Sequence, residues 1–295
     1  MTKGVLTIAT LAAVWSLNAV AATPIDRRID ADADGRLEVH NIAGSIEITG
    51  WTRREVQVTG ELADNVERLD VLAEGDRVIV RVVLRDNSHS RDGTHLVISA
   101  PQDSELDVNA VSASISVRGI QGEQRLASVS GRIDTETFER ELTARTVSGG
   151  VRVDGHDRPA LTRANAVSGH VILNNVSGEV YAQSVSGHVE LTGDSLERAQ
   201  VNSISGHVRV RSGLTERARI EATTTSGNVT LVFAGDAAAD YQLVTFSGGI
   251  DNCFGPPPPQ SPRGGPRREH RFRQGTSEAR VHATTMSGSI DLCRE

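Results

Sequence analysis

A five-residue pattern, Val-Ser-Gly-x-Val, occurs in eight exact or looser copies between residues 129 and 292 and constrains the fold more than any other feature. Its glycines are Gly131, Gly149, Gly169, Gly187, Gly206, Gly227, Gly248 and Gly288. Successive glycines are 18, 20, 18, 19, 21, 21 and 40 residues apart. A period near 20 residues is typical of proteins that stack one supersecondary unit.

Each copy carries two alternating segments around its Ser-Gly pair. Aliphatic residues stand two and usually four places after the glycine, as Val189 and Leu191 do after Gly187, with a polar residue between them. A second alternating pair, such as Val180 and Ala182, stands seven and five places before it. Period-two alternation predicts half-buried strands, so one repeat reads as strand, Ser-Gly corner, strand and variable turn.

A single repeat cannot bury its apolar face, whereas stacked repeats can. We therefore predict an all-β fold, a parallel β-solenoid. The spacing of the repeat glycines indicates about 18–21 residues per coil. The usual crossover rule favours a right-handed path. An aromatic content of 3% suits a thin core of Val, Ile, Leu and Ala. The alternative is a sandwich or barrel of antiparallel hairpins, which does not explain a Ser-Gly corner at the same place in every copy.

The pattern divides the chain into three parts. Residues 1–21 resemble a secretory signal peptide, with Lys3, an apolar stretch and a small-x-small cleavage site. Residues 22–110 are expected to form an irregular N-terminal β section that caps the solenoid, with a hairpin at Gly75-Asp76. Residues 111–295 hold the repeats.

The segment 254–276 interrupts the last interval and is rich in proline and arginine. We expect a disordered insertion loop there. Its basic residues are a candidate partner-binding cluster for an acidic surface: Arg263, Arg267, Arg268, Arg271 and Arg273.

The charge and the N-terminus point to an exported protein. The net charge of −7 is unfavourable for nucleic-acid binding. The apolar stretch of the signal peptide is too short for a membrane span. We expect a periplasmic or cell-surface protein without a transmembrane segment.

Cys253 and Cys293 each follow a repeat glycine by five residues. If their coils are neighbours, the two Cα atoms lie about 4.8 Å apart, which is within disulfide range. Export makes oxidation plausible. We predict a disulfide; two free thiols are the alternative, and the absence of a CxxC motif argues against a metal or redox role.

His170, His188 and His207 directly follow the glycine in three consecutive copies. Stacking in register would make a histidine column with steps of about 4.8 Å. Such a column is a candidate zinc or copper site. The alternative is that a corner simply prefers polar residues, as Arg132 and Asn228 indicate at the same position.

Asp30, Asp32 and Asp34 begin a D-x-D-x-D-G sequence like that of a calcium-binding loop. The twelfth position is Asn41, which cannot supply the bidentate carboxylate. The alternative is an acidic turn before a strand.

No catalytic motif accompanies the repeats. Asp251 and Asp291 are a possible carboxylate pair, but no aromatic sugar platform or cleft is evident around them. The repeated Ser-Gly lacks the G-x-S-x-G context of a nucleophile. We predict neither enzymatic activity nor a cofactor.

The repeated V-S-G-x-[VI]-x-[VL] corners, the signal peptide and the less regular β section resemble a bacterial family of β-strand-repeat domains of unknown function, whose members are labelled putative adhesins. The resemblance covers about residues 30–292 and implies an envelope or surface role. We therefore expect an exported, non-enzymatic scaffold that binds an unidentified protein or polysaccharide of the envelope. A polysaccharide-acting β-helix enzyme and a metal-binding envelope sensor are the alternatives.

Overall fold

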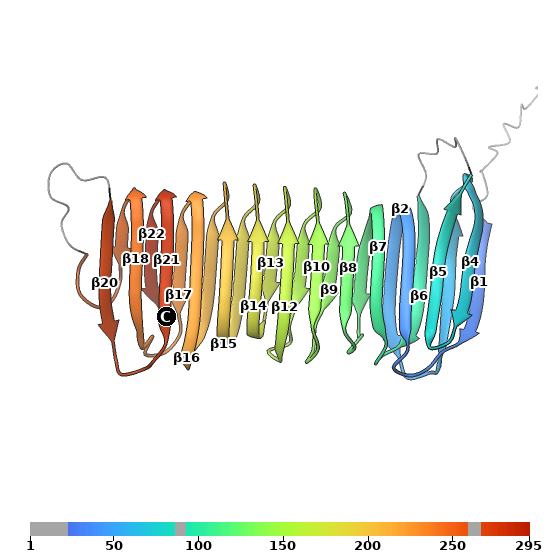
Figure 1. Ribbon diagram of the computed structural model, residues 1–295, viewed down its shortest axis with the longest axis horizontal. Helices are drawn as coiled ribbons and strands as arrows, with labels where there is room; N and C mark the ends of the chain where they lie inside the picture. The colour runs from blue at the N-terminus through green and yellow to red at the C-terminus, as the bar shows by residue number, and fades with distance from the viewer. Residues whose placement is uncertain (1–22, 86–92, 259–266) are drawn as a thin grey trace, which may run out of the picture.

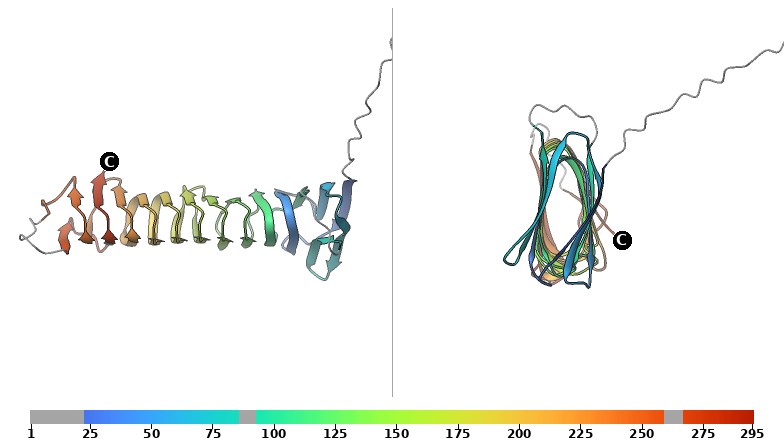
Figure 2. Two further views of the ribbon diagram at one scale, coloured as in Figure 1. Left: turned by 90° about the horizontal axis from the view of Figure 1, so that it is seen from above. Right: turned by 90° about the vertical axis from the view of Figure 1, so that its right-hand side faces the viewer.

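The computed structural model describes residues 23–85, 93–258 and 267–295, and every regular element in these ranges is a β-strand. The strands form two facing layers along an elongated molecule (Figure 1). Seen end-on, the coils superimpose into a flattened ring (Figure 2). The predicted all-β solenoid is confirmed. Within the same ranges the chain forms no helix with the length and hydropathy needed to cross a membrane. The predicted signal peptide, residues 1–21, lies outside them.

Two parallel stacks of strands make the central coils. The strands that lead into the corners are β8 (Gln124–Ser128), β10 (Leu142–Thr146), β12 (Pro159–Ala166) and β14 (Ser177–Ser184). Those that leave the corners are β9 (Ile133–Glu136), β11 (Val151–Asp154), β13 (Val171–Asn174) and β17 (Val229–Phe233). β15 (Val189–Ser203) and β16 (Val208–Ser226) are longer, because each continues through the variable turn into the next leading strand.

The register of these strands puts equivalent aliphatic residues in one interior file. Val151 pairs with Val171, Val171 with Val189, and Val189 with Val208, all in parallel strands. Each of the four is at most 2% exposed. The core is therefore a continuous column of side chains rather than a series of separate hairpins, which excludes the antiparallel alternative for this part of the chain.

The corner glycines are required because the adjacent coil occupies the space of a side chain. An ideal Cβ on Gly187 would lie 2.0 Å from the carbonyl oxygen of Gly169, and one on Gly206 would lie 2.0 Å from that of Gly187. Neither residue has a φ in the left-handed region. The close backbone approach, not conformational freedom, therefore explains the repeated glycine.

A buried hydroxyl three residues before the corner glycine joins neighbouring coils. The Ser184 hydroxyl donates to the Gly169 carbonyl at 2.9 Å and accepts the Gly187 N–H at 2.9 Å. The same pair of bonds is made by Ser128, Thr146 and Ser203. Ala166 holds this position in one coil and has no hydroxyl to offer. The bonds satisfy polar groups that the tight corner withdraws from water.

The solenoid begins earlier than residue 111. β2 (Arg36–Trp51) pairs in parallel with β7 (Glu105–Arg118) on one edge, and with β5 (Arg77–Leu84) and β6 (Thr94–Pro101) on the other. The section 22–110 therefore contains two regular coils, and the coil of β2 lies inside that of β5 and β6. The sequence boundary was wrong because no Val-Ser-Gly pattern stands between β5 and β6 in the sequence.

Three antiparallel strands cover the N-terminal end of the stack. β3 (Glu55–Leu62) pairs with β6, β1 (Thr23–Asp30) pairs with β3, and β4 (Val66–Glu74) pairs with β5. The last pair closes through the predicted hairpin at Gly75-Asp76, since Glu74 lies opposite Arg77. These strands protect an edge that would otherwise expose unpaired backbone groups.

The C-terminal coils do not stack in chain order. β21 (Arg280–Ser287) pairs with both β16 and β18 (Ala239–Ser247), and β22 (Ile290–Arg294) pairs with both β17 and β19 (Ile250–Asn252). Residues 280–294, which we call the intercalated coil, therefore lie between the coils of Gly227 and Gly248. The corner hydroxyls agree: Thr285 donates to the Gly227 carbonyl and Thr245 to the Gly288 carbonyl, each at 2.9 Å.

The predicted disordered insertion 254–276 is partly a strand. β20 (Arg268–Gln274) pairs antiparallel with β18 and covers the last edge of the stack. His270 and Phe272 point inward, where Phe272 stacks on Tyr241 with ring centroids 4.8 Å apart. Phe233 and Phe254 complete this aromatic end plug. The proline and arginine content of the insertion masked the period-two alternation of residues 268–273.

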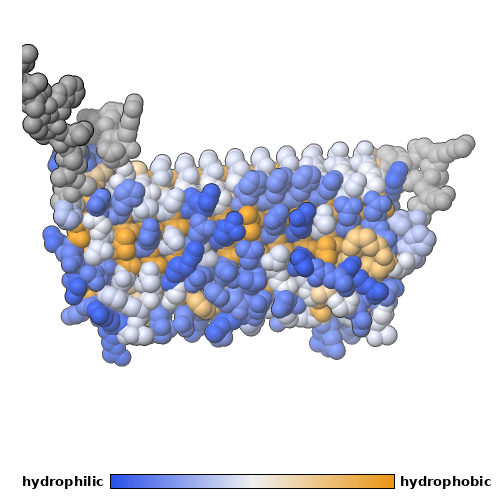
Figure 3. All heavy atoms as spheres, turned by 180° about the vertical axis from the view of Figure 1, so that it is seen from behind, coloured by the Kyte–Doolittle hydropathy of each residue, from blue (hydrophilic) through white to orange (hydrophobic). Residues whose placement is uncertain are grey.

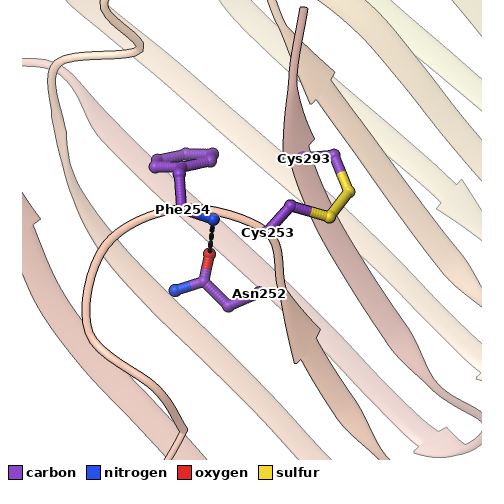
Figure 4. Close-up of a disulfide and its surroundings, with 4 residues drawn as sticks. All are labelled: Asn252, Cys253, Phe254 and Cys293. Carbon is purple, nitrogen blue, oxygen red and sulfur yellow. Dashed lines mark hydrogen bonds between the residues drawn. A yellow bond between two sulfur atoms is a disulfide. The ribbon is translucent and has the colours of Figure 1, made fainter.

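The predicted disulfide between Cys253 and Cys293 is present, with Cα atoms 4.8 Å apart. It ties the end of β19 to β22 and so fixes the intercalated coil to the coil outside it (Figure 4). Directly after the bridge, the Phe254 N–H donates to Asn252 Oδ1 at 3.2 Å, which turns the chain away from the sheet.

We predict that Gly187→Ala lowers the free energy of unfolding by roughly 1–3 kcal/mol, because the new methyl group forces two backbones apart. Gly249→Ala is the control: its Cβ would meet nothing closer than Ser289 Oγ at 3.6 Å, so its effect should stay within about 0.5 kcal/mol. Urea unfolding followed by circular dichroism measures both. Similar losses for the two variants would contradict the close-approach explanation.

The corner hydroxyls give a second prediction: removing one should lower the free energy of unfolding, and adding one should raise it. Ser184→Ala should cost about 1–3 kcal/mol, because it leaves a buried carbonyl and a buried N–H without this partner. Ala166→Ser should add about 0.5–1.5 kcal/mol by supplying the missing bonds. The same unfolding measurement applies, and a destabilising Ala166→Ser would show that this corner has no room for the hydroxyl.

Candidate functional site

A shallow depression of about 310 Å³ lies on the face made by the leading strands, over β14, β15, β16 and β21. Its lining is basic and polar, with one tyrosine: Tyr181, Arg198, Ala199, Gln200, Arg219, Ile220, Glu221, Arg280 and His282. Glu221 is the one carboxylate in this lining. With histidine neutral, the three arginines leave the depression with an excess of positive charge.

Arg198, Arg219 and Arg280 occupy one position in three neighbouring coils, and we call them the arginine column. Arg198 pairs in register with Arg219, and Arg219 with Arg280. Neighbouring strands of a sheet lie about 4.8 Å apart, so the three side chains leave the sheet as close neighbours. Within the described ranges none of them forms an ion pair or a side-chain hydrogen bond. Three adjacent guanidinium groups without carboxylate partners make a local positive potential.

Acidic residues end the column on both sides. Glu179 pairs in register with Arg198, and Asp240 pairs with Arg280. Next to the depression, Arg217 forms an ion pair with Glu278 at 3.3 Å. Its charge is therefore neutralised, unlike the charges of the arginine column. The unpaired positive charge is thus confined to three coils.

The intercalated coil creates this column. Stacking in chain order would place Asp240 beside Arg219, because their coils follow each other in the sequence. Arg280 lies between them instead, pairing with Arg219 on one side and Asp240 on the other. The site could not be predicted from the sequence for two reasons. The stacking order of the intercalated coil differs from the chain order, and a register shift between Leu196 and Arg198 hides the alignment of Arg198 with Arg219.

Tyr181 gives one end of the depression an aromatic wall. Its ring is partly buried and lies beneath the Arg163 guanidinium, 5.5 Å from the ring centroid. Its hydroxyl donates to Glu179 Oε2 at 3.3 Å. Arginine forks bind carboxylate, sulfate and phosphate groups in a bidentate manner. The arrangement can therefore hold an anionic, partly planar ligand, and its lining contains no nucleophile activated by a general base.

The three predicted histidines form the expected column on the corner edge. Ring centroids of His170 and His188 are 5.0 Å apart, and those of His188 and His207 are 4.9 Å apart, with nearly parallel planes. Each Nδ1 accepts the backbone N–H of the next coil at 3.0 Å, from His188, His207 and Asn228 in turn. These bonds assign the proton of the neutral rings to Nε2.

This geometry does not support the metal hypothesis for the histidines. Each Nδ1 is already an acceptor, and parallel rings about 5 Å apart do not converge on a point about 2 Å from each nitrogen, as zinc requires. Across residues 23–85, 93–258 and 267–295, no three His, Cys, Asp or Glu side chains lie in an arrangement that could hold a metal ion. The column is a set of side-chain to backbone bonds that continues as Asn228 Oδ1 accepts the Ser289 N–H at 3.0 Å.

The aspartates of the calcium hypothesis lie at an exposed turn. Asp30 ends β1, while Asp32 and Asp34 follow before β2 begins. Asn41, which stands at the twelfth position of the proposed loop, is buried in β2, where its Nδ2 donates to the Thr94 carbonyl at 3.0 Å. Strand pairing of residues 36–41 therefore prevents the chain from folding around an ion, which favours the acidic-turn alternative.

The arginines of the insertion differ in their contacts. Arg263 lies outside the described residues. Arg267 and Arg271 both contact Glu269, and the Arg271 hydrogen bond is the main reason that the pKa of Glu269 is lowered. Arg273 donates to the Ser277 carbonyl at 3.1 Å. Arg268 is exposed on the same strand. The partner-binding role of this cluster stays a prediction.

Asp251 and Asp291 pair in register on β19 and β22, as expected. Burial raises the pKa of Asp291, and the charge of Asp251 raises it further. The pair lies in the stack of strands that leave the corners, whereas the arginine column lies in the opposite stack.

The histidine column should make stability depend on pH. Burial lowers the pKa of His188, and His170 and His207 lower it further while Glu190 opposes them. Since the unfolded chain takes up a proton that the native state resists, stability should fall as pH drops through about 6.5.

We predict that His188→Asn, which keeps an acceptor as Asn228 does, reduces this loss between about pH 7.5 and about pH 5.5. The urea midpoint at the two pH values measures it, with His40→Asn, outside the column, as the control. An unchanged difference between the midpoints in His188→Asn would contradict the role of the column.

Comparisons with known proteins identify the family of this chain. The model of the Toastrack DUF4097 family matches residues 35–293. No curated protein matches the chain. Similar solved structures include a putative adhesin from Parabacteroides merdae, 9% identical with a TM-score of 0.49, over 91% of this chain and 95% of that one. A putative adhesin from Bacteroides fragilis is 11% identical with a TM-score of 0.42, over 92% and 98%. A putative cell adhesion protein from Clostridium sporogenes is 7% identical with a TM-score of 0.22, over 92% and 100%.

At these identities and TM-scores the three structures carry no argument about this chain. The family model is different, because it spans nearly all of the solenoid and all but the last residue of the intercalated coil. The resemblance inferred from the Val-Ser-Gly corners is confirmed: the chain belongs to the Toastrack DUF4097 family.

Proposed function

We propose that the protein is an exported, non-enzymatic binding scaffold of the bacterial cell envelope or surface, adhesin-like, which holds an anionic partner on the arginine column. The observation that carries the proposal is the row of Arg198, Arg219 and Arg280, which no carboxylate neutralises within the described residues. Like charges in adjacent positions repel, so an anionic ligand relieves a repulsion that the fold itself imposes.

The solenoid suits recognition by a fixed array of groups. The arginines project from paired strands whose backbones are bonded to coils on both sides, so their spacing is set before the ligand arrives. Pre-organised groups lose less conformational entropy on binding. A chain-like anion with regularly spaced carboxylate or sulfate groups, such as an acidic polysaccharide, is the ligand class that this row fits, and Tyr181 offers a sugar ring a flat apolar face.

Export is supported by the signal-like residues 1–21 and by the disulfide. Disulfides persist in oxidising compartments such as the periplasm and the cell surface. The disulfide also stabilises the coil that supplies Arg280, because Cys293 belongs to the intercalated coil.

A binding role is favoured over polysaccharide cleavage by the position of the carboxylates. The pair Asp251 and Asp291 lies on the opposite layer from the arginine column. A polymer held by the arginines would not be presented to that pair. Glu221 alone shares the depression, and one carboxylate does not make the pair that glycoside hydrolysis ordinarily uses.

We predict that the protein binds polygalacturonate but not neutral dextran, and that Arg219→Ala weakens this binding at least tenfold, in line with about 1.5–3 kcal/mol for a hydrogen bond to a charged group. Arg209→Ala is the matched control, since Arg209 lies on the same strand, β16, but in the other layer. It changes the net charge equally and should leave affinity nearly unchanged. Isothermal titration calorimetry at two salt concentrations measures both.

Equal losses in the two variants would show a diffuse attraction to net charge and contradict a site at the column. Release of reducing or unsaturated ends from the polymer would contradict the non-enzymatic part of the proposal.

A further inference from the structure

One long edge of the solenoid carries a continuous row of exposed apolar side chains. They stand two residues before each corner glycine or its equivalent, and we call them the apolar ridge. In the order of the stacked coils they are Ile42, Val111, Val129, Val147, Val167, Val185, Ile204, Met286 and Phe246, each 40–54% exposed. Thr225 is the one polar residue of the row and lies between Ile204 and Met286.

Backbone bonds from corner to corner keep the ridge straight. The Val147 N–H donates to the Val129 carbonyl and the Val185 N–H to the Val167 carbonyl, each at 3.2 Å. Single exposed aliphatic residues are normal in soluble proteins, whereas a contiguous row marks an interaction surface.

A groove runs beside the ridge on the side of the leading strands. It has a volume of about 490 Å³ where it is best formed, next to Val167, Val185 and Ile204. The small residues Ala166, Ser184 and Ser203 form its floor, and Arg145, Asn165, Gln183 and Asn202 form its far wall. Over the coils of Gly149, Gly169, Gly187 and Gly206 the edge therefore presents a ridge and a groove of the same period.

The edge is free of acidic residues, although the chain has 38 of them and a net charge of −7. From four residues before the corner glycine to one residue after it, the ten coils from Gly44 to Gly248 contain no Asp or Glu. Two arginines, Arg132 and Arg145, are the charged residues of this band apart from histidines. Figure 3 shows the same edge as a regular row of pale, uncharged residues above a face rich in hydrophilic side chains.

We propose that this edge is an interface between two copies of the chain, in which the ridge of each copy lies in the groove of the other. Two acidic molecules repel each other in general, but along this edge they meet without opposed carboxylates. Ridges of one period fit grooves of the same period, so a two-fold arrangement satisfies both copies at once.

The dimensions suit a second copy. Ten corners with steps of about 4.8 Å extend over about 43 Å, which is long enough for an interface of about 800 Å² per partner. A membrane surface is the less suitable occupant, because helices and loops that bind anionic lipid carry basic residues beside their apolar face, and this edge has few. The arginine column lies farther from the corner than the groove, so this interface is independent of the proposed ligand site.

The test is the association state of the mature chain, measured by sedimentation equilibrium. We expect a dimer in the micromolar range. The triple variant Val147→Thr, Val167→Thr and Val185→Thr should raise the dimer dissociation constant at least tenfold. Threonine is β-branched and of similar size, and it already holds this position at Thr225, so the fold should persist; far-UV circular dichroism checks this.

Val97→Thr is the matched control, because Val97 is 43% exposed but lies away from the ridge; it should leave the dissociation constant unchanged. A monomeric wild-type chain at high micromolar concentration would overturn the proposal, as would a triple variant that dimerises as tightly as the wild type. A monomer that binds lipid vesicles through this edge would overturn it in favour of a membrane surface.

Discussion

The contact between each corner glycine and the carbonyl oxygen of the adjacent corner sets the distance between coils, and the rest of the molecule follows from that distance. With no Cβ at Gly187 or Gly206, two backbones approach to the spacing of paired strands at the point where the chain turns. The buried hydroxyl of residues such as Ser184 then bonds across the same gap. Because the corners close at strand spacing, both flanking strands pair in register and the aliphatic residues meet in one interior file.

A fixed register turns each outward position of the repeat into a row of chemically similar groups. The row of histidines bonds to the backbone, the row of valines leaves an apolar edge, and the row of arginines concentrates positive charge. Rows of apolar or hydrogen-bonding residues stabilise a stack, whereas a row of like charges opposes it. Many exposed arginines of the described residues have a carboxylate partner, as Arg36 has in Glu105. The arginine column differs in that three arginines without a carboxylate partner hold one register position in consecutive coils, and this juxtaposition is the physical reason for assigning it a ligand.

The repeat was sufficient to predict the solenoid, the disulfide and the histidine column, because each depends on contacts between adjacent coils with matching corners. Cys253 and Cys293 meet whether the coil of Gly288 lies inside or outside that of Gly248. The arginine column could not be predicted, because it depends on which side that coil takes, and the Val-Ser-Gly pattern is the same for both. Nor could the coil of β5 and β6, because no such pattern stands between these two strands in the sequence. The repeat period shows that a segment belongs to the stack, but it does not show which coils are its neighbours. The bulge before Arg198 also shifts the register locally, and this shift cannot be detected by counting residues in the sequence.

The intercalated coil makes the order of synthesis differ from the order of stacking. Residues 280–294 are translated after both of the coils between which they lie. Until they arrive, β16 and β17 lack the strands with which they pair on that side in the native fold, and so do β18 and β19. β20 and the residues of the aromatic end plug precede residues 280–294 in the sequence, so the last segment to be synthesised belongs inside the stack and not at its tip. The native order of coils at this end can therefore be completed only after residues 280–294 have been synthesised, whereas a linear array of repeats could be completed one coil at a time.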